Sequence, residues 1–441
     1  MGSEWVATTL GDIALGRDGA VDGPFGSNLP ASCYQDVGIP VVRGSNLSVG
    51  LGEFKDDGFV YVSDSTFDKL SRSECKAGDI VFTKKGTLGQ TGLITSEHKF
   101  DRYLLSSNQM RLRVDPTKAI PEYVYFCVSS KKTILKLIKD SESTGVPKIN
   151  LAYLKSIQIE LPSIEIQKEI IGHLGALNSK ITLNNQINQT LEQMAQAIFK
   201  SWFVDFDPVK AKMNGEQPKG MDAVTASLFP EKLVESELGL IPEGWDVGTL
   251  SDVAKYCSAR TNTDTISLEN YISTENMLAE KKGVTAASKL PTAKTVAAYK
   301  SGDILVSNIR PYFKKIWLAE GSGGRSNDVL GFESVSENTD SYLMNLLYQD
   351  TFFEYMTRTS KGAKMPRGDK TAIMNWEMAV PPVELREAFS AIVDKFYQLI
   401  PQNRAQNATL ESLRDTLLPK LLSGEVDLES VQVEQAKALT E

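Results

Sequence analysis

An internal duplication constrains the fold of this 441-residue chain more than any other feature. The ten residues that start at Trp5 recur from Trp245, with Trp, Thr, Leu, Asp and Ala at matching positions. A Gly-Asp-Ile triplet at residues 78–80 recurs at residues 302–304. Three further matches share an offset of 219 residues and begin at residues 107, 161 and 190. Five matches in one order indicate two similar halves, and a repeat of this length argues against a solenoid of short units.

Each half has the same predicted plan. A segment of Gly, β-branched and aromatic residues comes first, and each Gly-Asp-Ile triplet indicates a turn that leads into a short buried strand. Apolar periodicity predicts a helix over residues 123–139 and its counterpart over residues 341–356. Prolines at Pro162 and at Pro381 then mark the start of a long helical pattern. The predicted fold class is α+β, with two similar globular domains separated by two long helices and a pseudo-two-fold internal repeat.

Both long helices carry a heptad pattern, because apolar residues recur at alternating spacings of four and three. The a and d positions of the heptad form a seam, which is the row of residues that faces the partner helix. This seam runs from Ile170 to Trp202 in the first helix and from Phe389 to Leu421 in the second. A helix of this length extends over roughly 50–55 Å. The pattern predicts an antiparallel coiled coil with a left-handed supercoil.

Two asparagines lie on each seam near the middle of the helix. If the helices pair antiparallel, Asn184 and Asn188 face Asn407 and Asn403 in a polar layer, which lowers stability but fixes the register. The alternative is that these asparagines are solvated on a face of the helix outside the seam. Pro401 lies within the second pattern, so we expect a kink or an interruption there.

Six segments follow from these patterns. A linker that contains four prolines separates the halves, and the C-terminal end is acidic and polar. The predicted segments are a first domain over 1–162, a spacer helix over 163–203, a linker over 204–243, a second domain over 244–381, a spacer helix over 382–422 and an acidic tail over 423–441.

The overall composition limits the functional classes. The net charge of −8 argues against a simple DNA-binding protein, although a near-neutral domain can still present a basic face. The four cysteines are scattered and only His98 and His173 are present, which argues against a structural zinc site. No apolar run of about 18 residues and no secretory leader occurs, so we expect a reduced, cytoplasmic protein without a membrane span.

No catalytic motif is found in the sequence. A phosphate-binding Walker loop, a dinucleotide-binding glycine pattern after a strand and an amino-methyltransferase motif are all missing. Asp205 and Asp207 could hold Mg²⁺ as paired carboxylates. However, they open the linker, and Asp207 before Pro208 fits a turn or a helix cap better. We therefore predict no catalytic residue, no metal site and no cofactor in this chain.

Two pairs of basic loops are candidates for contact with nucleic acid. The loop at residues 84–90 follows a predicted strand, and its repeat equivalent is at residues 307–315. The second pair, at residues 145–150 and 361–370, precedes the helix starts. A solvated charged loop is the alternative interpretation of each. The candidate DNA contacts are Lys84, Lys85, Gln90, Lys148, Asn308, Arg310, Tyr312, Lys314, Lys315, Lys364, Arg367 and Lys370.

The order of these motifs resembles the specificity subunit of type I DNA restriction-modification systems. The resemblance rests on the Trp-x-x-x-x-Leu-x-Asp starts at Trp5 and Trp245 and on the two Gly-Asp-Ile segments. It also rests on Gly-Pro-Phe-Gly-Ser at residues 23–27, Ser-Asn-Ile-Arg-Pro at residues 307–311 and the proline-marked helix starts. The junctions at residues 199–208 and 240–245 fit the same pattern, so the resemblance covers nearly the full length.

The resemblance implies that residues 1–162 and 244–381 are target recognition domains. Each would read one half of a split, asymmetric sequence in double-stranded DNA, while the two helices set the gap between the half-sites. Two modification subunits would dock and transfer a methyl group from S-adenosylmethionine to adenine N6. Restriction subunits, which use ATP and Mg²⁺, would cleave the DNA, whereas this chain would bind no cofactor.

Three alternatives remain open. The first is a non-enzymatic coiled-coil scaffold without a DNA role, which the negative net charge favours and the matching basic loops disfavour. The second is a single-chain nuclease that uses Asp205 and Asp207. The third is a subunit that binds DNA weakly by itself and needs its partner subunits to complete a complex around the DNA.

Overall fold

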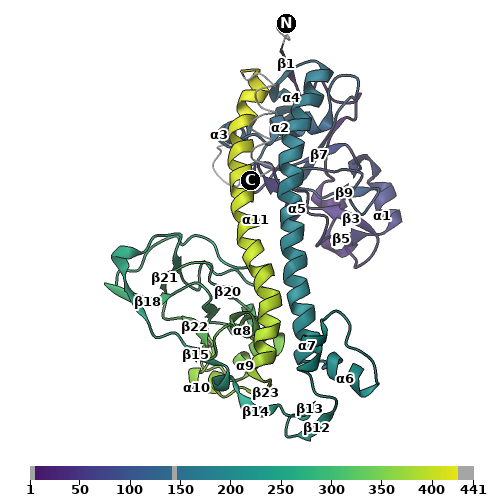
Figure 1. The fold of residues 1–441 in the computed structure, drawn as a ribbon. Helices are drawn as coiled ribbons and strands as arrows, with labels where there is room; N and C mark the ends of the chain where they lie inside the picture. Colours follow the sequence, from purple (N-terminus) through teal and green to yellow (C-terminus); the bar gives the residue numbers. More distant parts are fainter. Residues whose placement is uncertain (1–4, 142–146, 426–441) are drawn as a thin grey trace. The chain divides into compact units, whose positions relative to one another are not determined.

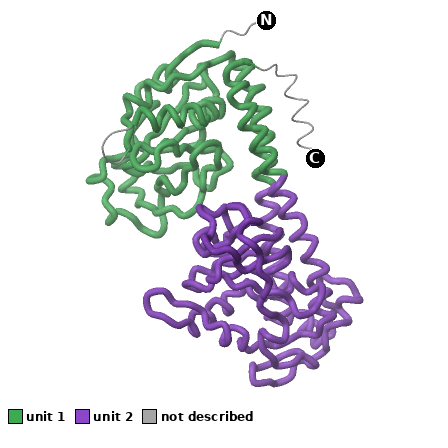
Figure 2. The backbone as a smooth tube through the Cα atoms, turned by 90° about the vertical axis from the view of Figure 1, so that its left-hand side faces the viewer, with its two compact units in different colours: residues 1–183, 406–441 green, residues 184–405 purple. Residues whose placement is uncertain are grey.

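The computed structural model describes residues 5–141 and 147–425, so most of the predicted acidic tail lies outside the described residues. The chain divides into two compact units (Figure 2): unit 1 comprises residues 1–183 and 406–441, and unit 2 comprises residues 184–405. Two long helices, α5 (Ile164–Phe203) and α11 (Val383–Ser423), each contribute a segment to both units. Each unit therefore contains one globular domain and a pair of helix segments.

Unit 1 is built on two sheets, and Figure 1 labels β7 of the first and β3, β5 and β9 of the second. The strand order of the first is β2-β10-β7-β8-β4, and that of the second is β5-β3-β9-β6. The strands of the first sheet are β2 (Ala20–Asp22), β10 (Gln109–Arg113), β7 (Asp79–Thr83), β8 (Gln90–Leu93) and β4 (Ser48–Val49). Those of the second are β5 (Val60–Val62), β3 (Ile39–Val42), β9 (Tyr103–Leu105) and β6 (Glu74–Cys75). A separate antiparallel pair joins β1 (Val6–Thr9) to β11 (Gln158–Leu161), and the short helices are α1 (Asp64–Lys69), α2 (Pro121–Val128), α3 (Lys131–Asp140) and α4 (Leu151–Ser156).

Unit 2 repeats most of this arrangement, although its first sheet has four described strands where that of unit 1 has five. Its first sheet has the order β15-β22-β19-β20, and its second has the order β16-β18-β21-β17. The first contains β15 (Ala254–Tyr256), β22 (Val329–Ser334), β19 (Ile304–Ser307) and β20 (Ile316–Leu318). The second contains β16 (Arg260–Asn262), β18 (Thr295–Tyr299), β21 (Gly323–Arg325) and β17 (Tyr271–Ile272). The pair β14 (Asp246–Thr249) and β23 (Glu377–Val380) matches β1 and β11, and the short helices are α8 (Asp340–Leu347), α9 (Asp350–Arg358) and α10 (Lys370–Met374).

The repeated sequence motifs form the same turns in both units. Gly78 and Gly302 adopt φ values of 88° and 89°, a conformation that glycine reaches without strain. The aspartate that follows accepts a hydrogen bond across the turn, from Lys76 N to Asp79 Oδ2 at 2.8 Å and from Lys300 N to Asp303 Oδ2 at 2.9 Å. Each Gly-Asp-Ile triplet therefore opens a buried strand, as predicted.

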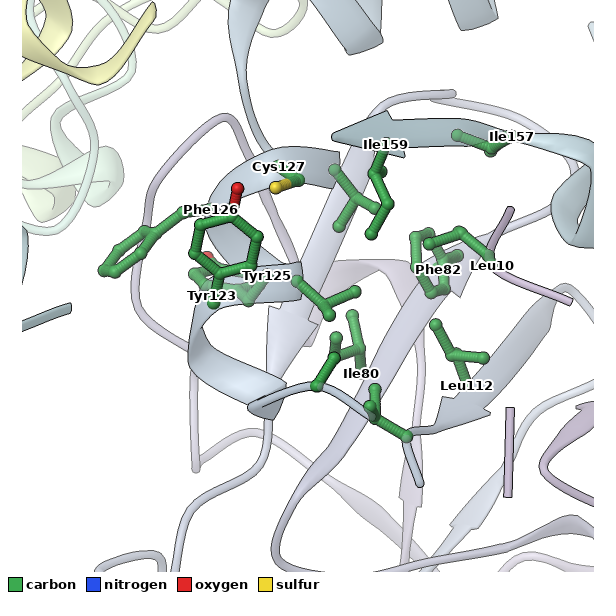
Figure 3. Packing of buried hydrophobic residues seen from close by; sticks show 14 of the residues in the cluster. Leu10, Ile80, Phe82, Leu112, Tyr123, Tyr125, Phe126, Cys127, Ile157 and Ile159 are labelled. Atoms are coloured by element: carbon green, nitrogen blue, oxygen red, sulfur yellow. The ribbon is translucent and has the colours of Figure 1, made fainter. Parts of the chain in front are cut away.

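The core of unit 1 holds the strand that precedes the first basic loop (Figure 3). Ile80 and Phe82 of β7 and Leu112 of β10 pack with residues of helix α2 and strand β11. Tyr123 of α2 is fully buried and donates a hydrogen bond from its hydroxyl to the Glu160 carbonyl at 2.7 Å. This packing fixes the end of β7, where the chain leaves the core.

The prediction of one helix over residues 123–139 and one over residues 341–356 is wrong, because each range contains two helices. The break between α2 and α3 falls at Ser129 and Ser130, and the break between α8 and α9 falls at Tyr348 and Gln349. Ser130 accepts a hydrogen bond from the Thr133 backbone N–H at 3.4 Å and so caps α3. Serine favours the N-cap over the helix interior. Apolar periodicity alone does not detect such a helix boundary.

The heptad seam is packed inward in both units. None of the seam positions is exposed between Ile170 and Trp202 or between Phe389 and Leu421. In unit 1 the pair runs antiparallel, since Asn178 meets Arg414 and Ile181 meets Asn407. In unit 2 the buried rings at the two helix ends meet, with the Phe199 and Phe389 centroids 5.7 Å apart.

The expected interruption at Pro401 does not occur, because α11 is continuous from Val383 to Ser423. A proline inside a helix removes one backbone hydrogen bond and costs about 3 kcal/mol. Side chains just before it hold the helix in place. Ile400 is buried, and the Tyr397 hydroxyl accepts a hydrogen bond from Asn345 Nδ2 at 3.0 Å. Tertiary packing therefore outweighs the local preference.

The predicted linker contains the expected short structured pieces, and these pack against the domain. They are α6 (Asp207–Met213), α7 (Ala223–Ser227) and the hairpin β12 (Leu233–Ser236) and β13 (Gly239–Pro242). Val209, Phe229 and Ile241 are buried in the same cluster as Trp202 and Trp245. This segment is thus part of the unit 2 core rather than a free tether.

Candidate nucleic-acid interface

In unit 1, two basic loops that are far apart in sequence are joined by backbone hydrogen bonds. Lys84 N donates to the Asn108 carbonyl at 2.8 Å, and Ile149 N donates to the Lys84 carbonyl at 2.9 Å. Gly86 N donates to the Pro147 carbonyl at 3.3 Å, with Gly86 at a φ of 105°. The loop after β7 and the segment before α4 therefore form one surface.

Unit 2 forms the matching set of bonds. Asn308 N donates to the Asp328 carbonyl at 2.8 Å, and Gly368 N donates to the Asn308 carbonyl at 3.1 Å. Arg310 N donates to the Pro366 carbonyl at 2.8 Å, with Arg310 at a φ of 50° in place of the glycine. The two loop pairs that were predicted separately from sequence are thus brought together in the same way in both units.

Some of the predicted DNA contacts present exposed cationic side chains at this surface. These residues are Lys85, Lys148, Arg310, Lys364 and Lys370, and Tyr312 is also exposed. Lys85 and Lys148 face each other across an antiparallel backbone bridge, and Ile309 and Arg367 form the matching bridge. Both units therefore place exposed positive charge on the joined loops, which suits phosphate contacts.

Other predicted contacts are partly neutralised within the protein. Lys84 Nζ lies 3.0 Å from Asp22 Oδ1, Lys314 Nζ lies 3.0 Å from Asp350 Oδ1, and Arg367 Nη2 lies 3.2 Å from Asp328 Oδ1. These pairs are at least partly exposed, so each contributes little stability.

Two predicted base-reading candidates in unit 2 lie deeper in the protein. Asn308 is buried, and its backbone rather than its side chain shapes the loop. Lys315 Nζ donates to the Thr274 carbonyl at 2.6 Å, and burial lowers the pKa of Lys315.

An open polar depression of about 450 Å³ adjoins the joined loops of unit 1. Lys85 and Gln90, both predicted from sequence, line it together with Arg43, Asn108 and Gln109. Arg43 follows β3, and Gln109 begins β10, so these residues come from strands remote from the basic loop. No local pattern marks Arg43 and Gln109, since only the sheet topology brings them beside the loop.

A second hollow in unit 1 is lined by Arg72, Arg111 and Arg113, and two of these arginines have a structural role. Arg113 donates to both carboxylate oxygens of Asp79 at 2.7 Å, and Arg111 Nη1 lies 3.7 Å from the same carboxylate. Because Asp79 is fully buried, these arginines neutralise it and are not free for a ligand.

The acidic pair in the linker is placed for structure. Asp205 forms an ion pair with Lys200, and Asp207 is the first residue of α6. Within residues 5–141 and 147–425, no group of three or more His, Cys, Asp or Glu side chains could hold a metal ion. The same described residues contain no helix that is both long and apolar enough to cross a membrane.

Comparison with known proteins shows what this chain is similar to. The model of the type I restriction modification DNA specificity domain matches residues 3–193. The HindI specificity subunit of Haemophilus influenzae is 23% identical over 96% of this chain and 100% of its own length. The MjaIX specificity subunit of Methanocaldococcus jannaschii is 25% identical over 85% of each chain. Residues 3–193 thus match the DNA specificity domain family, and nearly the whole chain is similar to specificity subunits of type I restriction enzymes.

The fold of this chain agrees with a solved structure. The type I S subunit from M. genitalium is 13% identical, and the match covers 95% of this chain and 96% of that chain with a TM-score of 0.51. At this identity the likeness concerns the fold alone. It confirms the α+β class.

Proposed function

We propose that this chain is the DNA-reading subunit of a type I restriction-modification enzyme. Each unit contacts one half of a split, asymmetric target in double-stranded DNA. The observation that supports this most strongly is the matched loop junction, in which the same three backbone bonds hold exposed cations in unit 1 and in unit 2. Phosphate contacts need lysine and arginine on a fixed backbone, and base contacts need polar side chains beside them.

The chain supplies recognition and its partners supply chemistry in this proposal. Two modification subunits dock on it and use S-adenosylmethionine to methylate adenine, and restriction subunits use ATP and Mg²⁺. In this proposal Asp205 and Asp207 take no part in cleavage; Asp205 pairs with Lys200 and Asp207 begins α6. Because the substrate is cellular DNA, the complex works in the cytoplasm.

The helices α5 and α11 act as a spacer in this proposal. Each is a continuous helix of 40 or 41 residues that takes part in both units. A stiff connection gives one half-site spacing, whereas a flexible linker gives a distribution of distances. The coiled-coil scaffold without a DNA role accounts for the helices but not for the matched cationic loops.

The test is to co-express the chain with its modification subunit and to map adenine methylation across a bacterial genome by long-read sequencing. We expect a split motif with one fixed gap. Methylation of a short continuous motif, or methylation that does not depend on this chain, would contradict the proposal. A pull-down of the modification subunit in the same cells verifies that the complex forms.

A further inference from the structure

The duplicated frame allows positions in the two units to be matched through strand register. Thr83 of β7 lies opposite Gln109 of β10, and Ser307 of β19 lies opposite Val329 of β22. These strands occupy the same places in their sheets, so Thr83 matches Ser307 and Gln109 matches Val329. The second of these matches pairs a polar residue in unit 1 with an apolar residue in unit 2.

The same register matches Gln90 with Lys315. Thr91 of β8 lies opposite Phe82, and Ile316 of β20 lies opposite Val306, so the preceding residues of β8 and β20 correspond.

A repeated asparagine turn identifies the neighbours of this position. Asn46 Oδ1 accepts from Arg43 N at 3.0 Å, and Asn276 Oδ1 accepts from Ser273 N at 2.6 Å. Arg43 therefore matches Ser273.

The next residues in the two turns, Gly44 and Thr274, support the match independently. A Cβ atom on Gly44 would lie 3.1 Å from Gln90 Oε1, while Lys315 Nζ donates to the Thr274 carbonyl at 2.6 Å. Gln90 and Lys315 thus reach the same turn in their own units.

In unit 1 two side-chain amides converge on the polar depression. Gln90 Oε1 accepts from Thr83 Oγ1 at 3.2 Å, and Gln109 Oε1 accepts from the Ser106 hydroxyl. Both amide oxygens are therefore engaged, which leaves the NH₂ groups of the two amides as donors in the lining of the depression. Nε2 of Gln109 would lie 3.8 Å from a Cβ atom on Gly44. In the major groove such donors pair with the N7 and O6 or O4 acceptors of base edges.

The glutamine at position 109 is not required by the fold. Its side chain is 2% exposed although it lines the depression, and a buried amide is costly to retain. The matched position in unit 2 holds Val329, which is fully buried in the same kind of strand. The matched strand of unit 2 therefore accepts an apolar residue here, whereas in unit 1 the Gln109 amide is held by Ser106 and adds a polar group to the lining of the depression.

We propose that Gln90 and Gln109, with Arg43 beside them, determine the base specificity of unit 1, and that Lys315, Val329 and Ser273 make unit 2 read a different half-site. This inference rests on the proposed function and names the side chains that perform it. Unit 1 then recognises a base edge rich in acceptors through paired amide donors. The asymmetry of the DNA target then follows from different side chains at matched positions of two similar backbones.

The test compares Gln90→Lys and Gln109→Val with the wild type in the complex with the modification subunit. Each variant introduces the residue that the other repeat carries, and Gln90 is only half-buried, so Gln90→Lys is expected to fold. Adenine methylation is mapped in cells, and the binding of the purified complex is measured on duplexes with each base at each half-site position. Gln158→Lys, on an exposed position of β11, is the matched control.

We expect a preference for the wild-type base at one or two positions of a single half-site to fall about 5- to 100-fold. The other half-site and the gap stay unchanged, and the control behaves as wild type. An unchanged motif overturns the inference. So does an equal loss of affinity for all sequences, because a phosphate contact or a folding defect gives that result. If the wild type itself shows no split motif, the proposed function fails instead.

Discussion

Asn403 of α11 donates a hydrogen bond from Nδ2 to Oδ1 of Asn188 in α5 at 2.8 Å. Both residues occupy seam positions, and Asn188 is 7% exposed. An amide pair on an otherwise apolar seam stabilises less than packed leucines but penalises any shift in register. This pair thus fixes how the two helix segments of unit 2 align.

Replacing Asn188 alone with leucine should destabilise unit 2 by about 1–3 kcal/mol, because the Asn403 amide loses its partner in a partly buried place. The double replacement Asn188→Leu and Asn403→Leu should restore or exceed the original stability. Thermal unfolding followed by circular dichroism measures both, with Gln189→Leu on the exposed face as the control. A double variant that is no more stable than the single variant would contradict the pairing.

The two Gly-Asp-Ile aspartates should respond oppositely to neutralisation. Asp79 is held by Arg111 and Arg113, and Asp79→Asn leaves these arginines without their anion, so we expect a loss of about 3–5 kcal/mol. Asp303 is buried without an arginine ion pair among the described residues, and its Oδ1 has no hydrogen-bond partner. Asp303→Asn should therefore maintain or raise the unfolding temperature at neutral pH.

The pH dependence of this effect has a definite sign. Burial raises the pKa of Asp303 above its ordinary value, so the folded protein binds the proton more tightly than the unfolded chain. The cost of ionising Asp303 is absent below the unfolded pKa and grows as the pH rises through the raised pKa. The stability gain of Asp303→Asn should thus vanish as the pH falls to about 3.9. A gain that is the same at acidic and neutral pH, measured by urea unfolding, would contradict this origin.

Salt dependence should separate free from paired lysines at the interface. Lys85 is exposed and forms no salt bridge with any described residue, whereas Lys314 is paired with Asp350. Lys85→Gln should lower the slope of log affinity against log salt by about 0.9 if this lysine meets one phosphate. Lys314→Gln should change the slope less. Fluorescence anisotropy with target DNA at several salt concentrations measures both slopes. If Lys85→Gln has the same slope as the wild type, the proposed contact of Lys85 is excluded.

Much of this architecture could be predicted from the sequence because repeats and heptads are local patterns. The 219-residue offset describes α4 and α10 as well as the long helices, and the seam residues are packed as their spacing requires. The basic loops at Lys85 and Arg310 were also visible as charge runs.

Other features depend on contacts between remote residues. The junction of Gly86 with Pro147 is one such contact, and the placement of Arg43 and Gln109 beside the loop is another. The continuity of α11 through Pro401 also depends on packing, which a single sequence does not encode as a motif.

The most direct test of the account is to change the length of the spacer. One heptad is inserted into α5 and one into α11 at facing seam positions, and methylation is mapped in the complex with the modification subunit. Seven residues lengthen a helix by about 10 Å, which corresponds to about three base pairs. A seven-residue insertion in only one helix is the control and should abolish methylation, because it breaks the register. We expect the same two half-sites with a gap longer by about three base pairs, and an unchanged gap would contradict the role of the helices as a spacer.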